Sequence, residues 1–184
     1  MCEAAWELVT NERARERRGA GGLVDALAES VQAAIDSGRR MGSECVNLEH
    51  FVLQHGHHWT IDTTQPLPRG FPPGERGQCH ANATRLVTQH EDLVYVEGYV
   101  LHTSLPIRHA WVQLPGGDAV DTTFAGLEHL STLEYFGVPF QTDFLLMTSL
   151  KAGEFMSLID DYPARWPLLS ASSAELAEAL WSPD

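Results

Sequence analysis

Two short segments of alternating side chains place the strongest constraint on the fold of this 184-residue chain. In residues 93–100, Tyr95, Glu97 and Tyr99 fall on one face, and the valines fall on the other. Such period-two alternation is typical of a strand that packs one face on a core. Residues 107–114 alternate in the same way. Two such segments close together in the sequence predict an antiparallel sheet.

The second segment leads into a predicted hairpin, and it places His109 and Trp111 on the same face. Pro115 and the two glycines after it are typical turn residues, so residues 119–124 can return as a third strand. If the chain turns near Pro115, His109 lies directly opposite Asp121 on the same face. A turn displaced by half a residue would put the two side chains on opposite faces, because side chains alternate along a strand.

Helical patterns occur on both sides of these strands. In residues 23–37, apolar side chains recur every four positions, as in a helix that packs on a core. The sequence also predicts helices over residues 3–18 and 143–150. Ser172 and Glu175 have the spacing of a capping box and predict the start of the last helix.

Length and element types predict a single domain of the α+β class. We expect a helical part in residues 1–58, a loop rich in proline and glycine in 59–78, a helix and antiparallel strands in 79–140, and a helical part in 141–184. Long loops in compact domains often form lids or cleft walls. A disordered linker is the alternative for this loop.

Two further segments are short. Residues 45–53 fit either a helix or a strand, because periodicity does not decide over so few positions. Residues 135–140 are predicted to be extended. Pro139 favours an edge position for this strand, because proline has no N–H to donate to a neighbouring strand.

The main candidate for chemistry is Cys79. A loop rich in proline and glycine precedes it, and residues 81–87 predict a helix with Ala83, Leu86 and Val87 on one side. Cys79 would therefore lie in or just before the first helical turn. The free N–H groups and the helix dipole at that end favour an anion, so they should lower the pKa of the thiol. The same N–H groups can stabilise an oxyanion.

The order Cys79, His109, Asp121 suits a nucleophile, its base and a carboxylate that orients the base. A cysteine considered alone is more often structural than catalytic. The histidine and aspartate downstream favour the catalytic interpretation.

The cysteine at a helix start, the His109-Ala110-Trp111 motif and the Asp121-Thr122-Thr123 motif resemble the papain-like superfamily, and most closely its transglutaminase-like branch. The resemblance covers the middle third of the chain. It implies a papain-like or transglutaminase-like fold and acyl chemistry through a thioester, as in peptidases, amidases, transglutaminases, deamidases and acyltransferases. Papain-type enzymes carry an oxyanion glutamine several residues before the cysteine, whereas Gln78 is adjacent here. The backbone N–H of Cys79 is therefore the better candidate.

Several neighbours are candidates for the oxyanion site or the cleft. They are Gln78, His80, Asn82 and Trp111. We expect His80 to be a poor base, since adjacent helical side chains point in different directions. Asn82 could line the cleft or cap the helix. Trp111 could shield the bond between His109 and Asp121 from water, or it could be an ordinary core aromatic.

Glu97 lies between Tyr95 and Tyr99 on the face opposite the valines. If this face lines the cleft, Glu97 could bind the amine or another cationic group of a substrate, with the two tyrosines beside it. If the face is exposed to solvent, Glu97 has no such role.

Three histidines in the segment His55-Gly56-His57-His58-Trp59 suggest a metal site. Zinc sites usually take ligands from spaced elements and add cysteine or carboxylate. An exposed loop or a cleft wall is the favoured interpretation, so we predict no metal and no other cofactor.

Composition argues against several classes of partner. The net charge is −13, with 25 acidic and 12 basic residues, which disfavours nucleic acid and anionic membrane surfaces. Three widely spaced cysteines predict no disulfide framework. No run of about 20 apolar residues and no signal peptide is evident, so we expect a cytoplasmic protein. Oligomeric state is not predicted.

The sequence thus predicts a cysteine-dependent enzyme that attacks an amide, peptide or thioester carbonyl through Cys79, His109 and Asp121. Its substrate would be a small molecule or a peptide, with water or an amine as acceptor. The alternatives are a binding module on the same scaffold with an inert Cys79, and a metal-dependent hydrolase that uses the histidine cluster.

Overall fold

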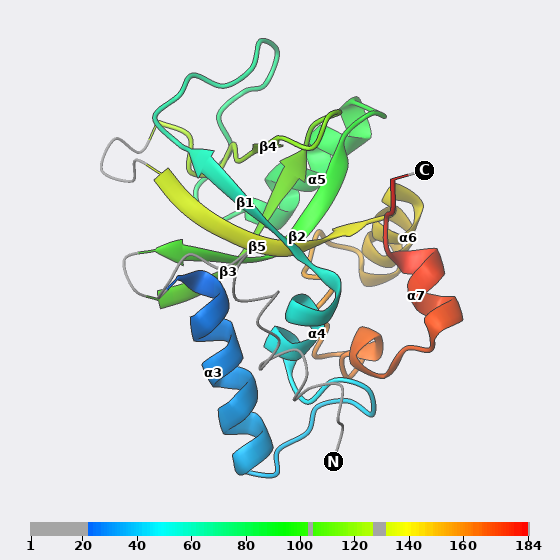
Figure 1. The fold of residues 1–184 in the computed structure, drawn as a ribbon. Coiled ribbons are helices and arrows are strands. Elements are labelled where there is room, and N and C mark those ends of the chain that lie inside the picture. Colours follow the sequence, from blue (N-terminus) through cyan, green and yellow to red (C-terminus); the bar gives the residue numbers. More distant parts are fainter. Residues whose placement is uncertain (1–21, 103–104, 127–131, 184) are drawn as a thin grey trace.

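The computed structural model describes residues 22–102, 105–126 and 132–183, and it combines helices with an antiparallel sheet, as expected for the α+β class (Figure 1). The helix predicted for residues 3–18 lies outside the described residues. In chain order, the elements are α3 (Leu23–Asp36), α4 (Leu48–His55), β1 (His57–Asp62), α5 (Cys79–Gln89), β2 (Val94–His102), β3 (Leu105–Gln113), β4 (Ala119–Val120), β5 (Thr132–Phe140), α6 (Thr142–Ala152), η1 (Pro167–Ser170) and α7 (Ser173–Ala179).

The sheet has the strand order β1-β5-β2-β3-β4, and each neighbouring pair is antiparallel. It curls so strongly that β1 and β4, at opposite ends of this order, come into contact. The indole N–H of Trp59 on β1 donates to the carbonyl of Gly117 beside β4 at 3.1 Å. Strand β2 lies at the centre of the sheet (Figure 1).

The two faces of β2 take part in different cores, and this confirms the predicted alternation. Tyr95 and Tyr99 belong to a core shared with helices α3, α4 and α5. Val96 and Val100 belong to a second core on the other face, which contains Trp111. Because both faces are covered, the polar side chains of β2 are buried as well as the apolar ones.

Within the described residues, the predicted helices form where their sequence signals place them. The buried stripe of α3 includes Leu23, Leu27 and Val31, and the chain turns just beyond it at Gly38, whose φ is +68°. Both bonds of the capping box between Ser172 and Glu175 are present at the start of α7. Residues 143–150 lie within α6.

The sequence pattern of residues 45–53 did not distinguish a helix from a strand. In the structure, most of this segment forms helix α4. The side chain of Asn47 accepts a hydrogen bond from the backbone N–H of His50 and starts this helix at Leu48. Asparagine is a favoured residue at this capping position, because its oxygen satisfies a donor that the helix leaves free.

The expected loop begins later than predicted. Residues 57–62 form strand β1, which pairs with β5, so the N-terminal part is not wholly helical and the irregular segment spans 63–78. Trp59 and Ile61 are buried and alternate with exposed neighbours. The pairing partners lie 70 to 80 positions further along the chain, so the local sequence gives little sign of this strand.

The prediction that Pro139 marks an edge strand is wrong, because β5 lies between β1 and β2. Strand β1 reaches only to a pairing between His57 and Gly137. The carbonyl of Pro139 instead accepts from the backbone N–H of Trp181, on the side where β1 would have continued. Proline has no N–H to donate, and among the described elements no neighbouring strand lies on this side of Pro139 to accept one.

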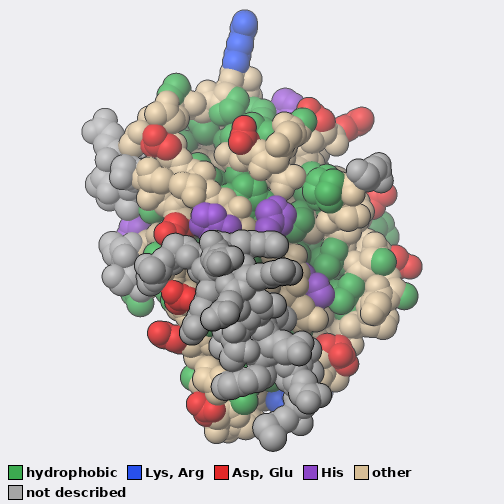
Figure 2. Space-filling model, viewed as in Figure 1, with side chains coloured by type: hydrophobic (Ala, Val, Ile, Leu, Met, Phe, Trp, Pro, Cys, Tyr) green, Lys and Arg blue, Asp and Glu red, His purple; other side chains and the backbone are tan. Residues whose placement is uncertain are grey.

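Acidic side chains are scattered over the face shown in Figure 2, whereas basic ones are few on it. This distribution agrees with the net charge of −13. Within the ranges that the structure covers, no helix is long and apolar enough to cross a membrane.

Gly137 on β5 makes room for Trp111 in the second core. Gly98 and Gly137 are direct partners across β2 and β5. A Cβ atom on Gly137 would lie 2.5 Å from the Trp111 ring and 2.8 Å from the carbonyl oxygen of Glu97. A side chain of any size would therefore displace an indole that is almost completely buried.

We expect Gly137→Ala to lower the free energy of unfolding by about 1–3 kcal/mol, because overpacking a dense core forces strained side chains or shifts of the backbone. Denaturant unfolding measures this change. Thr132→Ala, at the exposed start of the same strand, is the control and should cost less than about 0.5 kcal/mol. Equal stability of both variants would show that the core has room beside Trp111.

Candidate active site

Helix α5 begins at Cys79, as predicted. Gly77, with a φ of +75°, turns the preceding loop into the helix. The carbonyl of Gln78 accepts from the backbone N–H of Asn82 at 2.8 Å and forms the first helical turn. The Cys79 side chain is half-buried and thus lies at the helix terminus where backbone N–H groups favour an anion.

Strand β3 supplies His109, which is buried. Its Nε2–H donates to Oδ2 of Asp121 at 2.8 Å. The thiol of Cys79 hydrogen-bonds to the His109 side chain. Because Nε2 is engaged by the carboxylate, Nδ1 is the ring nitrogen that can face the sulfur. The structure therefore brings together the three side chains that the sequence suggested.

The hairpin that carries His109 and Asp121 differs from the predicted one. Val112 pairs with Val120, so the residue opposite Asp121 would be Trp111 and not His109. The register differs from the prediction by two residues, which preserves the face on which each side chain lies. Strand β4 also ends at Val120, much earlier than the expected Phe124. Asp121 reaches His109 diagonally from just beyond the strand.

Asp121 is buried, and both of its oxygens have donors. Oδ1 accepts from the backbone N–H of Thr123 at 2.8 Å and of Phe124 at 3.3 Å. Oδ2 accepts from the hydroxyl of Tyr135 at 2.7 Å, in addition to His109. A buried carboxylate needs such donors, because burial without hydrogen bonds disfavours its charged form.

Aromatic rings enclose the imidazole of His109. Phe124 stacks on it with ring centroids 4.5 Å apart and an interplanar angle of 9°. The centroids of Tyr135 and Trp111 lie at 6.1 Å and 6.5 Å from that of His109. Trp111 is thus both a core aromatic and part of the wall that keeps water from the bond between His109 and Asp121.

The sequence prediction missed Phe124 and Tyr135. Phe124 was expected within a strand and instead lies in the irregular turn that wraps Asp121. Tyr135 comes from β5, which is not a neighbour of β3 in the sheet. An alternating segment could have suggested that Tyr135 is buried, but only the curl of the sheet brings it to Asp121.

The electrostatics of the three residues favour a thiolate beside an imidazolium. Burial raises the pKa of Cys79, but hydrogen bonds and positive charge from His109 and His80 outweigh it and lower this pKa to about 6. Burial lowers the pKa of His109, but the charge and hydrogen bond of Asp121 raise it to about 9. The same pairing holds the pKa of Asp121 below its ordinary value, against the effect of burial.

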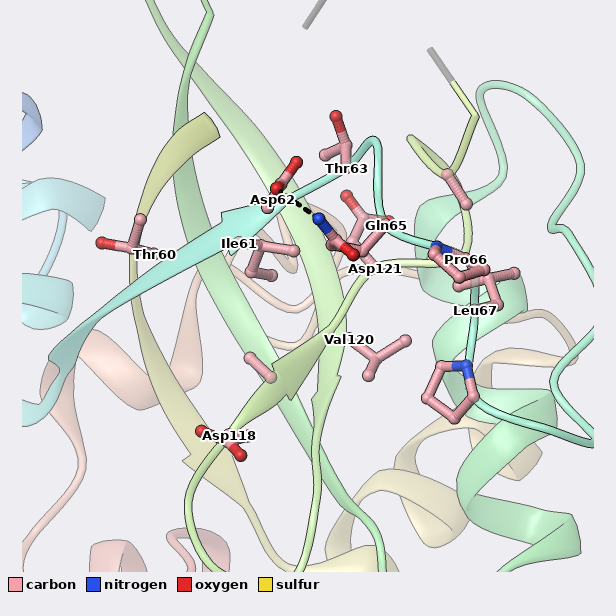
Figure 3. A pocket seen from close by; sticks show the side chains of 13 residues that line it. Thr60, Ile61, Asp62, Thr63, Gln65, Pro66, Leu67, Asp118, Val120 and Asp121 are labelled. Atoms are coloured by element: carbon pink, nitrogen blue, oxygen red, sulfur yellow. Dashed lines mark hydrogen bonds between the residues drawn. The ribbon is translucent and has the colours of Figure 1, made fainter. Parts of the chain in front are cut away.

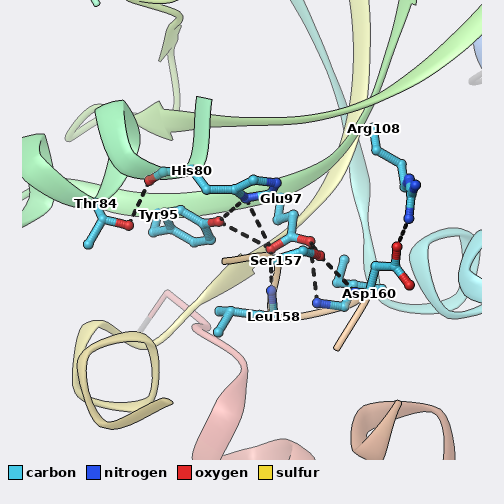
Figure 4. A network of polar contacts seen from close by, with 9 residues as sticks. His80, Thr84, Tyr95, Glu97, Arg108, Ser157, Leu158 and Asp160 are labelled. Carbon is cyan, nitrogen blue, oxygen red and sulfur yellow. Dashed lines mark hydrogen bonds and ion pairs between the residues drawn. The ribbon is translucent and has the colours of Figure 1, made fainter. Parts of the chain in front are cut away.

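His80 does not point away from the nucleophile, as its position next to Cys79 had suggested. Its side chain hydrogen-bonds to Cys79, and its Nδ1 donates to the hydroxyl of Tyr95 at 2.8 Å. That hydroxyl in turn donates to Oε2 of Glu97 at 3.1 Å, as Figure 4 shows. Position on the helix alone did not predict this direction, because the attraction toward Glu97 comes from a separate strand.

The face expected to bind a substrate amine is buried inside the protein. Glu97 is almost fully buried and accepts hydrogen bonds from the segment 157–159 (Figure 4). Tyr95 is engaged by Glu97, and the hydroxyl of Tyr99 donates to Oε1 of Glu49 at 2.9 Å. These three side chains therefore present no solvent face, and Glu97 and Tyr99 line only a small hollow of about 10 Å³.

Asn82 neither caps α5 nor lines an open cleft. Its side chain is buried, accepts from the backbone N–H of Glu75, and donates to the Glu75 carbonyl and to Oγ1 of Thr123. It therefore joins the helix of Cys79 to the loop before it and to the turn around Asp121. Gln78 is exposed and makes no capping bond with its side chain.

A cavity of about 320 Å³ adjoins Asp121 (Figure 3). Strand β1, the segment 118–121 and the loop residues 65–68 surround it. Part of the long loop therefore forms a wall of this cavity. Cys79 is not among the lining residues, so this cavity lies behind the carboxylate and not at the nucleophile.

The histidine cluster is divided between two elements. His55 ends α4, whereas His57 and His58 are successive residues of β1 and point to opposite faces of the sheet. The interpretation of this cluster as a loop is therefore wrong. Among the residues that the structure describes, no three histidine, cysteine or acidic side chains are placed to share a metal ion.

Comparison of the chain with known proteins gives no match to a family model, to a curated protein or to a solved structure. The chemistry of the site therefore has to be inferred from its own geometry.

Asp121→Asn tests the orientation of His109. An amide would keep its oxygen toward the N–H groups of Thr123 and Phe124 and turn its NH₂ toward Nε2. His109 would then accept at Nε2, carry its proton on Nδ1 and be unable to receive the thiol proton. We expect alkylation of Cys79 by iodoacetamide at pH 6.5 to slow at least about tenfold, because a neutral His109 no longer lowers the pKa of the thiol.

Asp118→Asn is the matched control, because Asp118 is exposed on the same hairpin. It should leave the alkylation rate unchanged. A rate in Asp121→Asn equal to that of the control, in a folded protein, would contradict the role of Asp121.

Proposed function

We propose that this protein is a cysteine-dependent acyl-transfer enzyme, in which Cys79 attacks an amide, peptide or thioester carbonyl. The observation that carries the proposal is the contact of a half-buried thiol at a helix start with a buried histidine that is itself bonded to a buried carboxylate. A nucleophile, a base and an orienting group in this geometry are the requirements of nucleophilic acyl chemistry.

The reaction begins from the thiolate of Cys79 and the imidazolium of His109. The sulfur attacks the carbonyl carbon, and the electron pair of the C=O bond moves to oxygen. Collapse of this intermediate breaks the bond to the leaving group, which takes a proton from Nδ1 of His109 when it leaves as an amine. An acyl thioester on Cys79 and a neutral His109 remain. Throughout, Asp121 holds Nε2–H and keeps Nδ1 toward the reaction.

The oxyanion would be stabilised at the start of α5. Backbone N–H groups in a first helical turn lack intrahelical partners and point outward, so they can donate to a developing negative charge. The N–H of Cys79 is the principal candidate. Gln78 is exposed next to it and provides a second possible donor through its side-chain amide.

The thioester is then resolved by water, which gives an amidase or a peptidase, or by an amine, which gives an acyltransferase or a transglutaminase-like enzyme. In both cases neutral His109 takes a proton from the acceptor, the C–S bond breaks, and Cys79 leaves as a thiolate. A small molecule or a peptide could supply the acyl group. Cys79 is only partly buried, so such a donor can approach from solvent.

The order of the three residues along the chain, on a helix followed by antiparallel strands, supports a fold of the papain-like or transglutaminase-like kind. The free thiols of Cys45 and Cys79 fit the reducing cytoplasm that we propose as the location. The buried Asp121, and not an asparagine, holds the histidine here.

The pH dependence of acyl transfer tests the ionisation of the pair. Activity requires the thiolate of Cys79, with a pKa of about 6, and protonated His109, with a pKa of about 9. For an amide substrate, kcat/KM should rise with pH through about 6, stay high near 7.5, and fall through about 9. A profile that rises only above pH 8 would show that Cys79 is an ordinary thiol.

His109→Ala provides the decisive test of the proposed function. We expect the pKa of Cys79, measured from the pH dependence of iodoacetamide alkylation, to increase by about 1 or more, because an imidazolium is lost from beside the sulfur. Incubation with activated thioesters, followed by intact mass spectrometry, should detect an acyl adduct in the unmodified protein and none in Cys79→Ala.

The matched control for His109→Ala is His90→Ala, at the opposite end of the helix that carries Cys79. It should leave the pKa of the thiol unchanged. An ordinary pKa in the unmodified protein, together with the absence of any acyl adduct, would overturn the enzyme proposal and favour a binding module with an inert cysteine.

A further inference from the structure

The sulfur of Cys79 has a second imidazole beside it. His80 hydrogen-bonds to Cys79, and its side chain keeps 23% of its surface exposed. With Nδ1 engaged by the hydroxyl of Tyr95, Nε2 is the ring nitrogen left for the sulfur or for a bound substrate. His109 approaches the same sulfur from strand β3, so two imidazoles from different elements meet at one atom.

The environment of Glu97 explains what holds His80 in this place. The Glu97 carboxylate accepts from the backbone N–H of Leu158 at 2.8 Å and of Ile159 at 3.3 Å, and from the hydroxyls of Ser157 and Tyr95. All of these groups donate, so they match the acceptor oxygens of a carboxylate. A carboxylate buried in this way is stabilised further by a cation nearby.

His80 supplies that cation, because its Nδ1 lies 3.8 Å from Oε2 of Glu97. Arg108, on the next strand, pairs with Asp160 instead. Among the described residues, no other cationic side chain makes an ion pair with Glu97. The titratable groups that face His80 are therefore Glu97 and Tyr95 from β2, Cys79 from its own helix and His109 from β3.

We propose that His80 is a second catalytic imidazole, which Glu97 and Tyr95 hold as a cation against the sulfur of Cys79. This proposal rests on the proposed acyl-transfer function and assigns a further residue to it. The site then has two histidine–carboxylate pairs, His109 with Asp121 and His80 with Glu97, on either side of one nucleophile. The shift of the His80 pKa above its ordinary value, against the effect of burial, agrees with the charge of Glu97.

The second pair has a specific use in the second half of the reaction. When the thioester is resolved, His109 must be neutral at the start so that it can take a proton from water or an amine. Cys79 is then the leaving group and needs a positive partner as the C–S bond breaks. His80 remains charged through this step, because its proton is not consumed, and it can stabilise the departing thiolate.

The test compares the pH dependence of Cys79 alkylation by iodoacetamide in the unmodified protein, His80→Gln, Glu97→Gln and His109→Ala. His90→Gln is the control, because His90 caps the end of this helix opposite to Cys79. If His80→Gln raises the thiol pKa from about 6 to about 7, the rate at pH 6 falls about fivefold. The rate at pH 9.5 should stay equal, since the thiol is ionised in every variant.

The expected result is a similar increase of the thiol pKa in Glu97→Gln, since His80 without its carboxylate loses its proton at lower pH. In His109→Ala the pKa should also increase but stay below about 8.5, because His80 still contributes its charge. No change in His80→Gln and Glu97→Gln, with a clear change in His109→Ala, would overturn this inference and leave the proposed function intact. An unchanged pKa in His109→Ala would overturn the proposed function instead.

A second measurement avoids substitution in the core, where Glu97→Gln could prevent folding. Histidine ring signals in the NMR spectrum are titrated before and after complete alkylation of Cys79 in the unmodified protein. Loss of the thiolate should lower the pKa of two histidines, assigned to His80 and His109. A change in His109 alone would overturn the role of His80.

Discussion

The bond between His109 and Asp121 is the interaction on which the rest of the site depends. Both side chains are buried, and an isolated charge in such a place would be strongly unfavourable. The protein therefore surrounds the carboxylate with donors, from Tyr135 and from the turn that contains Thr123 and Phe124. Removal of Asp121 would leave His109 without the charge that stabilises its protonated form, and removal of His109 would leave a buried Asp121 incompletely paired.

This requirement explains features of the sheet that lie away from the sulfur. Tyr135 belongs to β5, which β2 separates from β3, so it reaches Asp121 only because the sheet curls. The curl also encloses Trp111, and Gly137 leaves space for its ring. Asn82 then fixes the start of α5 to the same turn, so the nucleophile and the carboxylate are held by one set of contacts.

The sequence predicted those parts of the site that depend on local pattern. Cys79 at a helix start and His109 on an alternating strand follow from residues within a few positions of each. The contact of Asp121 with His109 was also expected, although the register that produces it differs by two residues. By contrast, Tyr135 and the burial of Glu97 depend on strand order and on the distant segment 157–159, for which short windows of sequence give no signal.

The pH range of stability follows from the same pair of residues. The pKa of Asp121 is lowered on folding, so its contribution is present above the ordinary value of 3.8 and is lost as pH falls through the lowered value. The pKa of His109 is raised, so its contribution is complete below 6.5 and disappears as pH rises through about 9. The ion pair thus stabilises the fold most between about pH 4 and 6.5. Because the thiolate of Cys79 forms only through pH 6, it is present near the upper end of this range, while most of the stabilisation remains.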